Sequence, residues 1–271
     1  MQSLSVLVML KQREQEYQQN QYKGMLLAMG NARYHLPENR PPKLECNKSP
    51  PDIDKTMLSR SANEEAFRAK GIKWCNLDGT EKELATLEKL FANQQPSIYK
   101  QAEASEANLQ RLNREQELTR YRYLVFATHG YFDENTPELS VIVLDQLDKT
   151  PGTDGFITAS EWVGYTLRSD LMVLSACQTG LGEIMRGEGV MGLPYALYVA
   201  GNKNTLMTLW NVADDGTAEF SKRFFTKLKQ GMDQVEALTE TKREFLQSDK
   251  YKLPYKYKRP LFWAPFVLYG I

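Results

Sequence analysis

The sequence predicts an α/β protein with a mostly parallel sheet flanked by helices. Two short apolar runs, rich in Val, Leu and Phe, lead into glycines at residues 123–130 and 171–180. Runs of this kind are typical of buried parallel strands. In the second half of the chain they alternate with segments of helical length, as expected of an α/β sheet. At 271 residues and 42% hydrophobic, the chain can bury a large core as one large domain or two small ones.

The composition narrows the classes of function. Basic and acidic residues number 34 each, so the net charge does not favour nucleic acid or an anionic membrane as the main partner. Three irregularly spaced cysteines argue against a disulfide framework and favour a reducing compartment. No stretch reaches the roughly 18 apolar residues of a spanning helix, and the apolar start at residues 4–10 lacks the flanks of a signal peptide. We therefore expect a soluble, cytoplasmic protein.

The first half of the chain is expected to hold helices and strands around a proline-rich loop. A leucine stripe predicts a helix over residues 80–91, with Thr80 as its N-cap and Glu83 as the capping-box partner. Five prolines between residues 33 and 55 predict the loop. The other expected elements are helices at residues 3–19 and 104–119 and strands at residues 24–29 and 97–101.

The second half is expected to contain most of the sheet. The strand at residues 123–130 is followed by a hairpin-type excursion at residues 139–147 and 155–157, and residues 158–161 open a short helix. The remaining elements are a strand ending at Cys177, a Gly-rich loop at 180–192, a helix ending near Gly201, strands at 205–209 and 265–269, and helices at 217–230 and 232–247.

A histidine and a cysteine, His129 and Cys177, stand at the carboxyl ends of the two apolar runs. In open α/β sheets, active sites usually lie beyond the carboxyl ends of such strands. In enzymes with a cysteine nucleophile, an imidazole next to the thiol acts as its base. Their separation of 48 residues is close to the roughly 50 found in caspases, although the local caspase signature is absent. The competing interpretations are a core histidine and a buried, inert cysteine.

Seven short blocks follow one another between residues 127 and 270. They read ATHGYF (127–132), PELS (137–140), DGFITA (154–159), LSACQTG (174–180), GEGVMGL (187–193), LWNV (209–212) followed by Asp214, and WAPFVLYG (263–270). This succession resembles the CHAT domains, which are caspase-like peptidase domains often attached to TPR repeats. The resemblance extends from about residue 24 to the C-terminus, and more loosely from Ser3. It implies a single CHAT domain over residues 1–271.

The resemblance implies a fold and a set of roles. The fold is of the caspase/separase type, with the catalytic His129 and Cys177 at the ends of neighbouring strands of a mostly parallel sheet. The backbone N–H groups of Gly130 and Cys177 would form the oxyanion hole, and a glycine lets the backbone approach the scissile carbonyl closely.

Two acidic residues are further candidates. By similarity to separase, Asp214 after the LWNV block would hold the basic side chain of a substrate. The alternative is that Asp214 and its neighbour Asp215 only stabilise a helix N-terminus. Glu188, between two glycines after the nucleophile, would line the cleft or simply anchor its loop.

The chain also departs from the family at its start. CHAT domains usually carry one or two further strands before the segment that matches Ser3, and no TPR helices precede it here. We therefore expect a domain that is N-terminally shortened relative to the family, either a shortened variant or a fragment of a longer TPR-containing protein.

The expected function is that of a cysteine endopeptidase that cleaves a protein substrate after a basic residue. The alternative is a catalytically inactive CHAT-like interaction module within a larger TPR-containing assembly. The peptidase mechanism implies no metal or organic cofactor. A zinc site made of His35, Cys46 and Cys75 is not expected either, because these residues lack any recognised zinc-site spacing. The expected partners are the protein substrate and a TPR region or activating partner. Residues 250–259 mix basic and aromatic side chains as single-strand binders do, but a solvated surface loop is the preferred interpretation and direct nucleic-acid binding is not expected.

Overall fold

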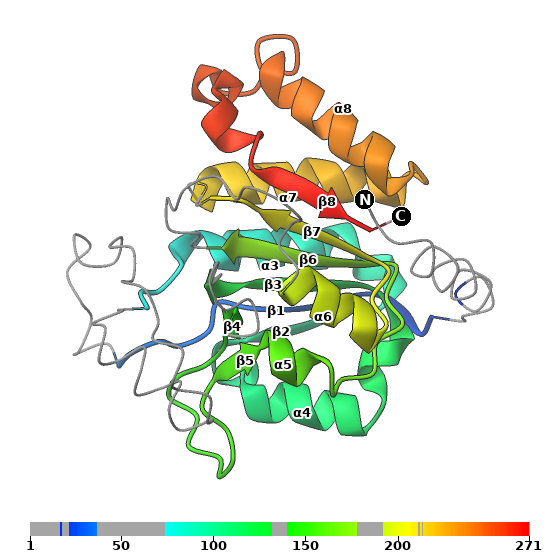
Figure 1. Ribbon diagram of the computed structural model, residues 1–271. Helices are drawn as coiled ribbons and strands as arrows, with labels where there is room; N and C mark the ends of the chain where they lie inside the picture. The colour runs from blue at the N-terminus through cyan, green and yellow to red at the C-terminus, as the bar shows by residue number, and fades with distance from the viewer. Residues whose placement is uncertain are drawn as a thin grey trace.

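The structure is a computed structural model that describes residues 17, 22–36, 74–131, 140–177, 192–210, 212 and 214–270. Within these ranges the side chains at positions 78, 176, 177, 214 and 215 are not described. The protein is built around one sheet with helices on both faces (Figure 1).

Within the described residues, eight strands form the sheet. They are β1 (Gly24–Gly30), β2 (Ser97–Lys100), β3 (Tyr121–Tyr131), β4 (Val141–Val143), β5 (Phe156–Thr158), β6 (Leu171–Cys177), β7 (Asn204–Thr208) and β8 (Phe266–Tyr269). The main order is β2-β1-β3-β6-β7-β8, parallel except for the antiparallel edge strand β8. The β4–β5 hairpin pairs antiparallel with the end of β3. The predicted α/β class with a mostly parallel sheet is confirmed.

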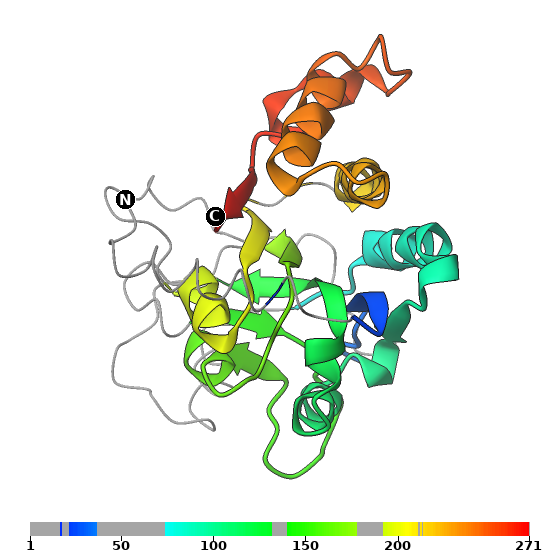
Figure 2. The same cartoon turned by 90° about the vertical axis from the view of Figure 1, so that its right-hand side faces the viewer.

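Two layers of helices cover the sheet. One layer holds α3 (Asp78–Leu90), α7 (Asp214–Lys229) and α8 (Gln234–Leu246), and the other holds α4 (Glu106–Arg114), α5 (Ala159–Trp162) and α6 (Leu193–Ala200). Figure 2 shows α3 and α7 on the side of the sheet opposite α6.

The two cores follow from the alternation of side chains along the central strands. On β3, Val125 packs toward the α3–α7 layer, whereas its neighbours Leu124 and Phe126 pack toward the α4–α6 layer. Successive side chains of a strand point to opposite faces, so a strand covered on both faces must be apolar at nearly every position. This explains the unbroken apolar runs in the sequence.

Most expected elements are present, with two differences in the first half of the chain. Helix α3 begins two residues before Thr80, after Leu77, so Thr80 is not the N-cap and Glu83 is not a capping-box partner. The helix expected over residues 104–119 ends at Arg114, because Gln116 adopts a left-handed conformation (φ 58°) before a 3-10 turn at Glu117–Arg120. The helix expected at residues 3–19 lies outside the described residues, apart from residue 17.

Two other expectations agree with the structure. The short helix expected to open at residues 158–161 is α5. Its N-cap Thr158 forms a capping box, in which the Thr158 side chain accepts from the backbone N–H of Glu161 and the Glu161 carboxylate accepts from the backbone N–H of Thr158. Gly201 ends α6 with φ 109°, a conformation that favours glycine. Within the described part of the chain, the helices are too short or too polar to cross a bilayer.

Candidate active site

The ends of β3 and β6 lie side by side. The two strands pair in parallel from Tyr123↔Leu171 onward, and the last Cα partners are Gly130 and Cys177. No strand intervenes between the one that carries His129 and the one that ends at Cys177. The backbones of the two candidate catalytic residues therefore lie side by side at the carboxyl edge of the sheet, which is the usual place of active sites in this class of fold.

The pairing shifts by one residue immediately beside His129. Ala127 pairs with Ser175 and Gly130 pairs with Cys177, so three steps along β3 match two along β6. An extra residue of this kind bends the strand and redirects the side chains next to it. The irregularity therefore changes the direction in which the His129 side chain leaves the sheet.

On the edge of β3 that faces away from β6, the neighbouring strand changes near the end of β3. Strand β1 stops at Gly30, which pairs with Ala127, and beyond that point β4 takes over. His129 then pairs with Val143 and Gly130 with Ile142 in antiparallel fashion. Because β3 is held on both sides up to its end, the backbone around His129 is fixed by the sheet rather than by a free loop.

The imidazole of His129 lies in a closed aromatic pocket. The side chain is 1% exposed, its Nε2 lies 2.5 Å from the carbonyl oxygen of Cys75, and the rings of Tyr34 and Trp74 lie 4.6 and 5.3 Å from its centroid. The Tyr34 hydroxyl accepts a hydrogen bond from the His129 backbone N–H (3.3 Å) and donates one to the carbonyl of Val143 (3.4 Å). Tyr34 thereby ties the histidine to the neighbouring strand.

This environment sets the protonation state of His129. Burial lowers the pKa of the imidazole to about 4, and the hydrogen bond to the Cys75 carbonyl opposes that shift. The ring is therefore neutral at pH 7. Since a carbonyl can only accept, the proton of the neutral ring is on Nε2, and Nδ1 carries the lone pair. Among the described residues Nδ1 has no hydrogen-bond partner, so it is the nitrogen that is available as a base.

The buried carboxyl group of Glu83 contacts the end of β6. The hydroxyl of Ser175 donates to Oε2 of Glu83 on α3 at 3.1 Å, and both side chains are 2% exposed. Ser175 precedes Cys177 by two residues. The contact fixes the last part of β6 against α3. From the sequence Glu83 was expected at a helix cap, because its helical spacing from Thr80 fits that role and nothing in the spacing points to Ser175.

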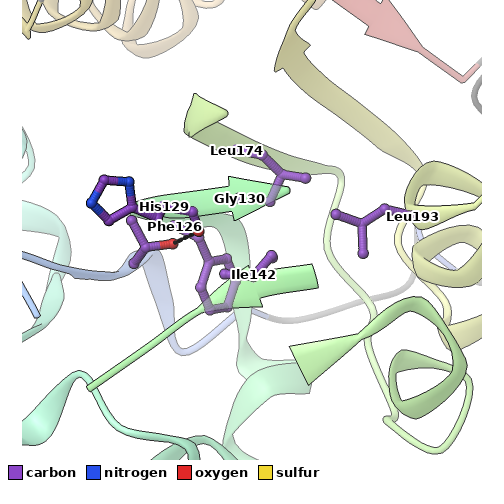
Figure 3. Close-up of a pocket in the computed structure, with 7 residues that line it drawn as sticks. Phe126, His129, Gly130, Ile142, Leu174 and Leu193 are labelled. Atoms are coloured by element: carbon purple, nitrogen blue, oxygen red, sulfur yellow. Dashed lines mark hydrogen bonds between the residues drawn. The ribbon is translucent and has the colours of Figure 1, made fainter. Parts of the chain in front are cut away.

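A small hollow adjoins the histidine on the side of α6. It is lined by Phe126, Thr128, His129, Gly130, Ile142, Leu174 and Leu193. Figure 3 shows the imidazole at one side and Leu193 at the opposite side, with Gly130 between them. The space next to Gly130 is therefore lined mainly by apolar side chains.

The structure brings some of the candidates together and leaves others undescribed. His129, Gly130 and the backbone of Cys177 share one corner of the sheet. Asp214 is the first residue of α7, but its side chain is not described, and Glu188 lies outside the described residues. Tyr34, Trp74 and the Cys75 carbonyl were not foreseen, because they surround His129 only through the fold.

Cys75 differs from the expectation of three reduced cysteines. It is disulfide-bonded, and the partner sulfur lies outside the described side chains. The described residues contain no group of three or more His, Cys, Asp or Glu side chains that could hold a metal ion.

The family model for the CHAT domain matches residues 2–271. The chain belongs to the CHAT domain family. A comparison with curated proteins gives no match. Among solved structures, a chain in the crystal structure of the Saccharomyces cerevisiae separase–securin complex is similar at 14% identity and a TM-score of 0.45, with 97% of this chain and 13% of that chain covered. The CHAT domain described here thus spans about an eighth of that protein's length.

Two of the sequence blocks that are typical of the CHAT family lie at the candidate active site. The ATHGYF block of this CHAT domain contains the irregular end of β3, and the LSAC part of the LSACQTG block ends β6. The two blocks meet as Cα partners although 48 residues separate His129 from Cys177. The family is caspase-like, so this corner is the candidate active site.

Proposed function

We propose that this CHAT domain is a cysteine endopeptidase with a His129–Cys177 dyad. The observation that carries the proposal is the arrangement of His129 itself. Its backbone lies on the strand directly next to the one that ends at Cys177. Its Nε2 contacts a carbonyl oxygen, so Nδ1 is left as the basic nitrogen. A core histidine would satisfy its buried polar atoms, whereas a general base needs one nitrogen held and the other unoccupied.

The reaction begins with the thiol. Nδ1 of His129 accepts the proton of the Cys177 thiol, and the thiolate attacks the carbonyl carbon of the scissile peptide bond. The backbone N–H groups of Gly130 and Cys177 hold the negative oxygen that develops. The imidazolium then gives its proton to the leaving amine, and an acyl-enzyme remains. Water attacks this thioester with His129 as the base, which restores the thiol and releases the new carboxyl end.

The Cys75 carbonyl supports both protonation states of the imidazole. It accepts from Nε2 in the neutral ring and continues to accept after Nδ1 is protonated. Burial lowers the pKa of His129, which keeps the resting ring neutral, whereas a thiolate in contact with Nδ1 favours the charged form. The dyad is therefore expected to become an ion pair only when the substrate closes the site.

The proposed substrate is a protein with Arg or Lys before the cut. Asp214 begins α7, which follows β7, and β7 runs beside the nucleophile's strand β6. A carboxylate near the helix start is stabilised by the N-terminal dipole, and it pairs well with a guanidinium. Glu188 is a second candidate for the wall of the same cleft.

Cleavage of a peptide library by the chain and by its Cys177→Ala and His129→Gln variants tests the proposal. The dyad predicts cleavage that both substitutions abolish while the far-UV circular dichroism spectrum stays unchanged. Cleavage that persists in the Cys177→Ala protein would show that another group, or a contaminating enzyme, does the chemistry. Absence of cleavage under all conditions, including added upstream sequence, would favour the interaction module.

A further inference from the structure

The segment that leads into β8 carries a strong local excess of positive charge. Residues 249–261, called the basic loop below, contain five basic side chains and a single acidic one, Asp249. The whole chain is balanced, with 34 basic and 34 acidic residues, so the excess belongs to this loop and not to the protein in general. The exposed basic side chains are Lys250, Lys252, Lys256, Lys258 and Arg259.

Buried side chains hold the basic loop in a fixed shape. Leu253 and Tyr257 are buried, and the ring of Tyr257 stacks on Phe245 of α8 with centroids 5.3 Å apart and planes 25° apart. Two 3-10 turns, η7 (Tyr255–Lys258) and η8 (Pro260–Phe262), shape the rest of the loop. The exposed cations therefore project from a preformed surface, which lowers the ordering cost of binding.

Two carboxylates near the basic loop, Asp249 and Glu244, do not cancel its charge excess. Asp249 lies 3.7 Å from Lys258, and both side chains are largely exposed, so the contact is screened by solvent. Glu244 of α8 instead pairs with Arg223 and Lys227 of α7, at 2.8 Å each. Its charge is directed toward α7 and does not neutralise the loop.

The aromatic residues of the basic loop do not form a stacking platform for bases. Tyr257 is buried, and the ammonium groups of Lys250 and Lys258 lie 5.3 and 5.8 Å from the ring centroids of Tyr251 and Tyr255. One face of each of these two rings therefore already has a cation of the same loop over it. Single-strand binders need successive open ring faces. The surface fits carboxylates better than nucleobases.

Two apolar side chains lie exposed among the cations. Tyr255 is 72% exposed and Leu261 is 48% exposed. Single exposed apolar residues are common on protein surfaces. These two side chains lie among basic ones, so the surface is complementary to a segment in which an apolar residue interrupts a run of acids, since protein interfaces combine an apolar centre with a polar rim.

The basic loop lies at the same edge of the sheet as the candidate active site. Its end leads into Phe266, which pairs with Thr208 at the end of β7, and the Leu209 N–H donates to the carbonyl of Pro265 at 3.0 Å. Strand β7 in turn runs beside β6. Figure 1 shows the loop, in orange and red, above the sheet on the side to which β6 points.

We propose that the basic loop is a docking surface for an acidic polypeptide segment, rich in Asp and Glu and interrupted by an apolar residue. The charge excess, the fixed shape and the two exposed apolar side chains carry this assignment. The proposal concerns binding alone and does not depend on peptidase chemistry, so the Cys177→Ala protein should bind equally well.

Fluorescence anisotropy with the full 271-residue chain tests the proposal. The probes are a labelled peptide of about 12 residues made of Asp and Glu with two leucines, the same peptide with Asn and Gln in place of the acids, and labelled oligo-dT. The variant combines Lys250→Gln, Lys252→Gln and Lys256→Gln. The matched control combines Lys82→Gln, Lys89→Gln and Lys149→Gln, three exposed lysines outside the loop.

The proposal predicts that the acidic peptide binds and that its affinity falls as salt rises from about 50 to about 300 mM. The loop variant should bind at least about tenfold more weakly and the control within about twofold of the unchanged protein. The proposal is overturned if the acidic peptide does not bind, if both variants lose the same affinity, or if the amide peptide binds as tightly. Tighter binding of oligo-dT, lost in the loop variant, would assign the surface to nucleic acid instead.

Discussion

Nε2 of His129 lies 2.5 Å from the backbone carbonyl oxygen of Cys75, a residue 54 positions earlier in the chain. This backbone carbonyl orients the ring and fixes its tautomer without contributing a charge. An acidic residue in that place would raise the pKa of His129. With a carbonyl, burial dominates and the pKa falls to about 4.

The dependence of stability on pH should show this shift. The unfolded histidine titrates near 6.5 and the folded one near 4, so the unfolded state binds more protons between these values. The contribution of His129 to the free energy of unfolding is therefore present above pH 6.5 and is lost as the pH falls toward 4. Over this range we expect the free energy of unfolding to fall by about 3 kcal/mol because of His129. The His129→Gln protein should not show this loss.

Only the difference between the two proteins measures this contribution. Burial raises the pKa of Glu106 to about 7, so the stability linked to that carboxyl is lost as the pH rises, in the opposite direction. Glu106 is present in both proteins and cancels. Urea unfolding of the two proteins at pH 7, 5.5 and 4 gives the difference, and a difference that does not change with pH would contradict the assigned pKa.

Tyr34 should matter for the position of His129 and not for the chemistry itself. Tyr34→Phe keeps the ring beside the imidazole but removes the acceptor for the His129 N–H and the donor to Val143. Each lost buried hydrogen bond costs about 1–3 kcal/mol. We expect a lower midpoint of urea unfolding and a lower kcat with little change in KM. A changed KM with unaltered kcat would place Tyr34 in substrate binding instead.

The close approach of β1 and β3 at Gly30 is a second test of the geometry. A Cβ at Gly30 would lie 2.5 Å from the carbonyl oxygen of Ala127 and 2.9 Å from its Cβ, at the last pair before the register shift. The backbone cannot move without disturbing His129. Gly30→Ala should therefore cost about 1–3 kcal/mol of stability and lower activity. Gly164→Ala, where the nearest atom is 3.3 Å away, is the control and should change stability by less than about 1 kcal/mol.

Full activity should require sequence or a partner beyond this chain. His129 is 1% exposed under Tyr34 and Trp74, so a substrate cannot reach it without a rearrangement. Addition of the upstream region or an activating partner should raise kcat/KM by at least about tenfold. Strong cleavage by the isolated chain that is unchanged by these additions would contradict this prediction.

Substrate specificity should depend on Asp214. Loss of one partner of a partly desolvated ion pair costs on the order of 3 kcal/mol, so Asp214→Ala should reduce cleavage after Arg or Lys by about a hundredfold without loss of folding. Asp215→Ala, at the same helix start, is the matched control. Cleavage after Asp or after large apolar residues would make the assignment wrong even if the dyad is correct.

The apolar runs and the helical periods were sufficient to predict the parallel strands and most of the helices, because burial on both faces requires unbroken apolar segments. The neighbouring ends of β3 and β6 were also foreseen. The aromatic pocket was not, because Tyr34 and Trp74 reach His129 from segments that no local pattern connects with it. Glu83 was assigned to a cap because its helical spacing fits, whereas its contact with Ser175 depends on how α3 lies on the sheet.

Covalent labelling of Cys177 tests the central claim most directly. The chain is first reduced, since Cys75 is disulfide-bonded, and is then treated with a peptidyl acyloxymethyl ketone that carries Arg at its end. We predict that peptide mass mapping finds the label on Cys177 and not on Cys46 or Cys75, and that His129→Gln slows labelling by at least about a hundredfold. Equal labelling of all three cysteines, or a labelling rate that His129→Gln leaves unchanged, would contradict the dyad.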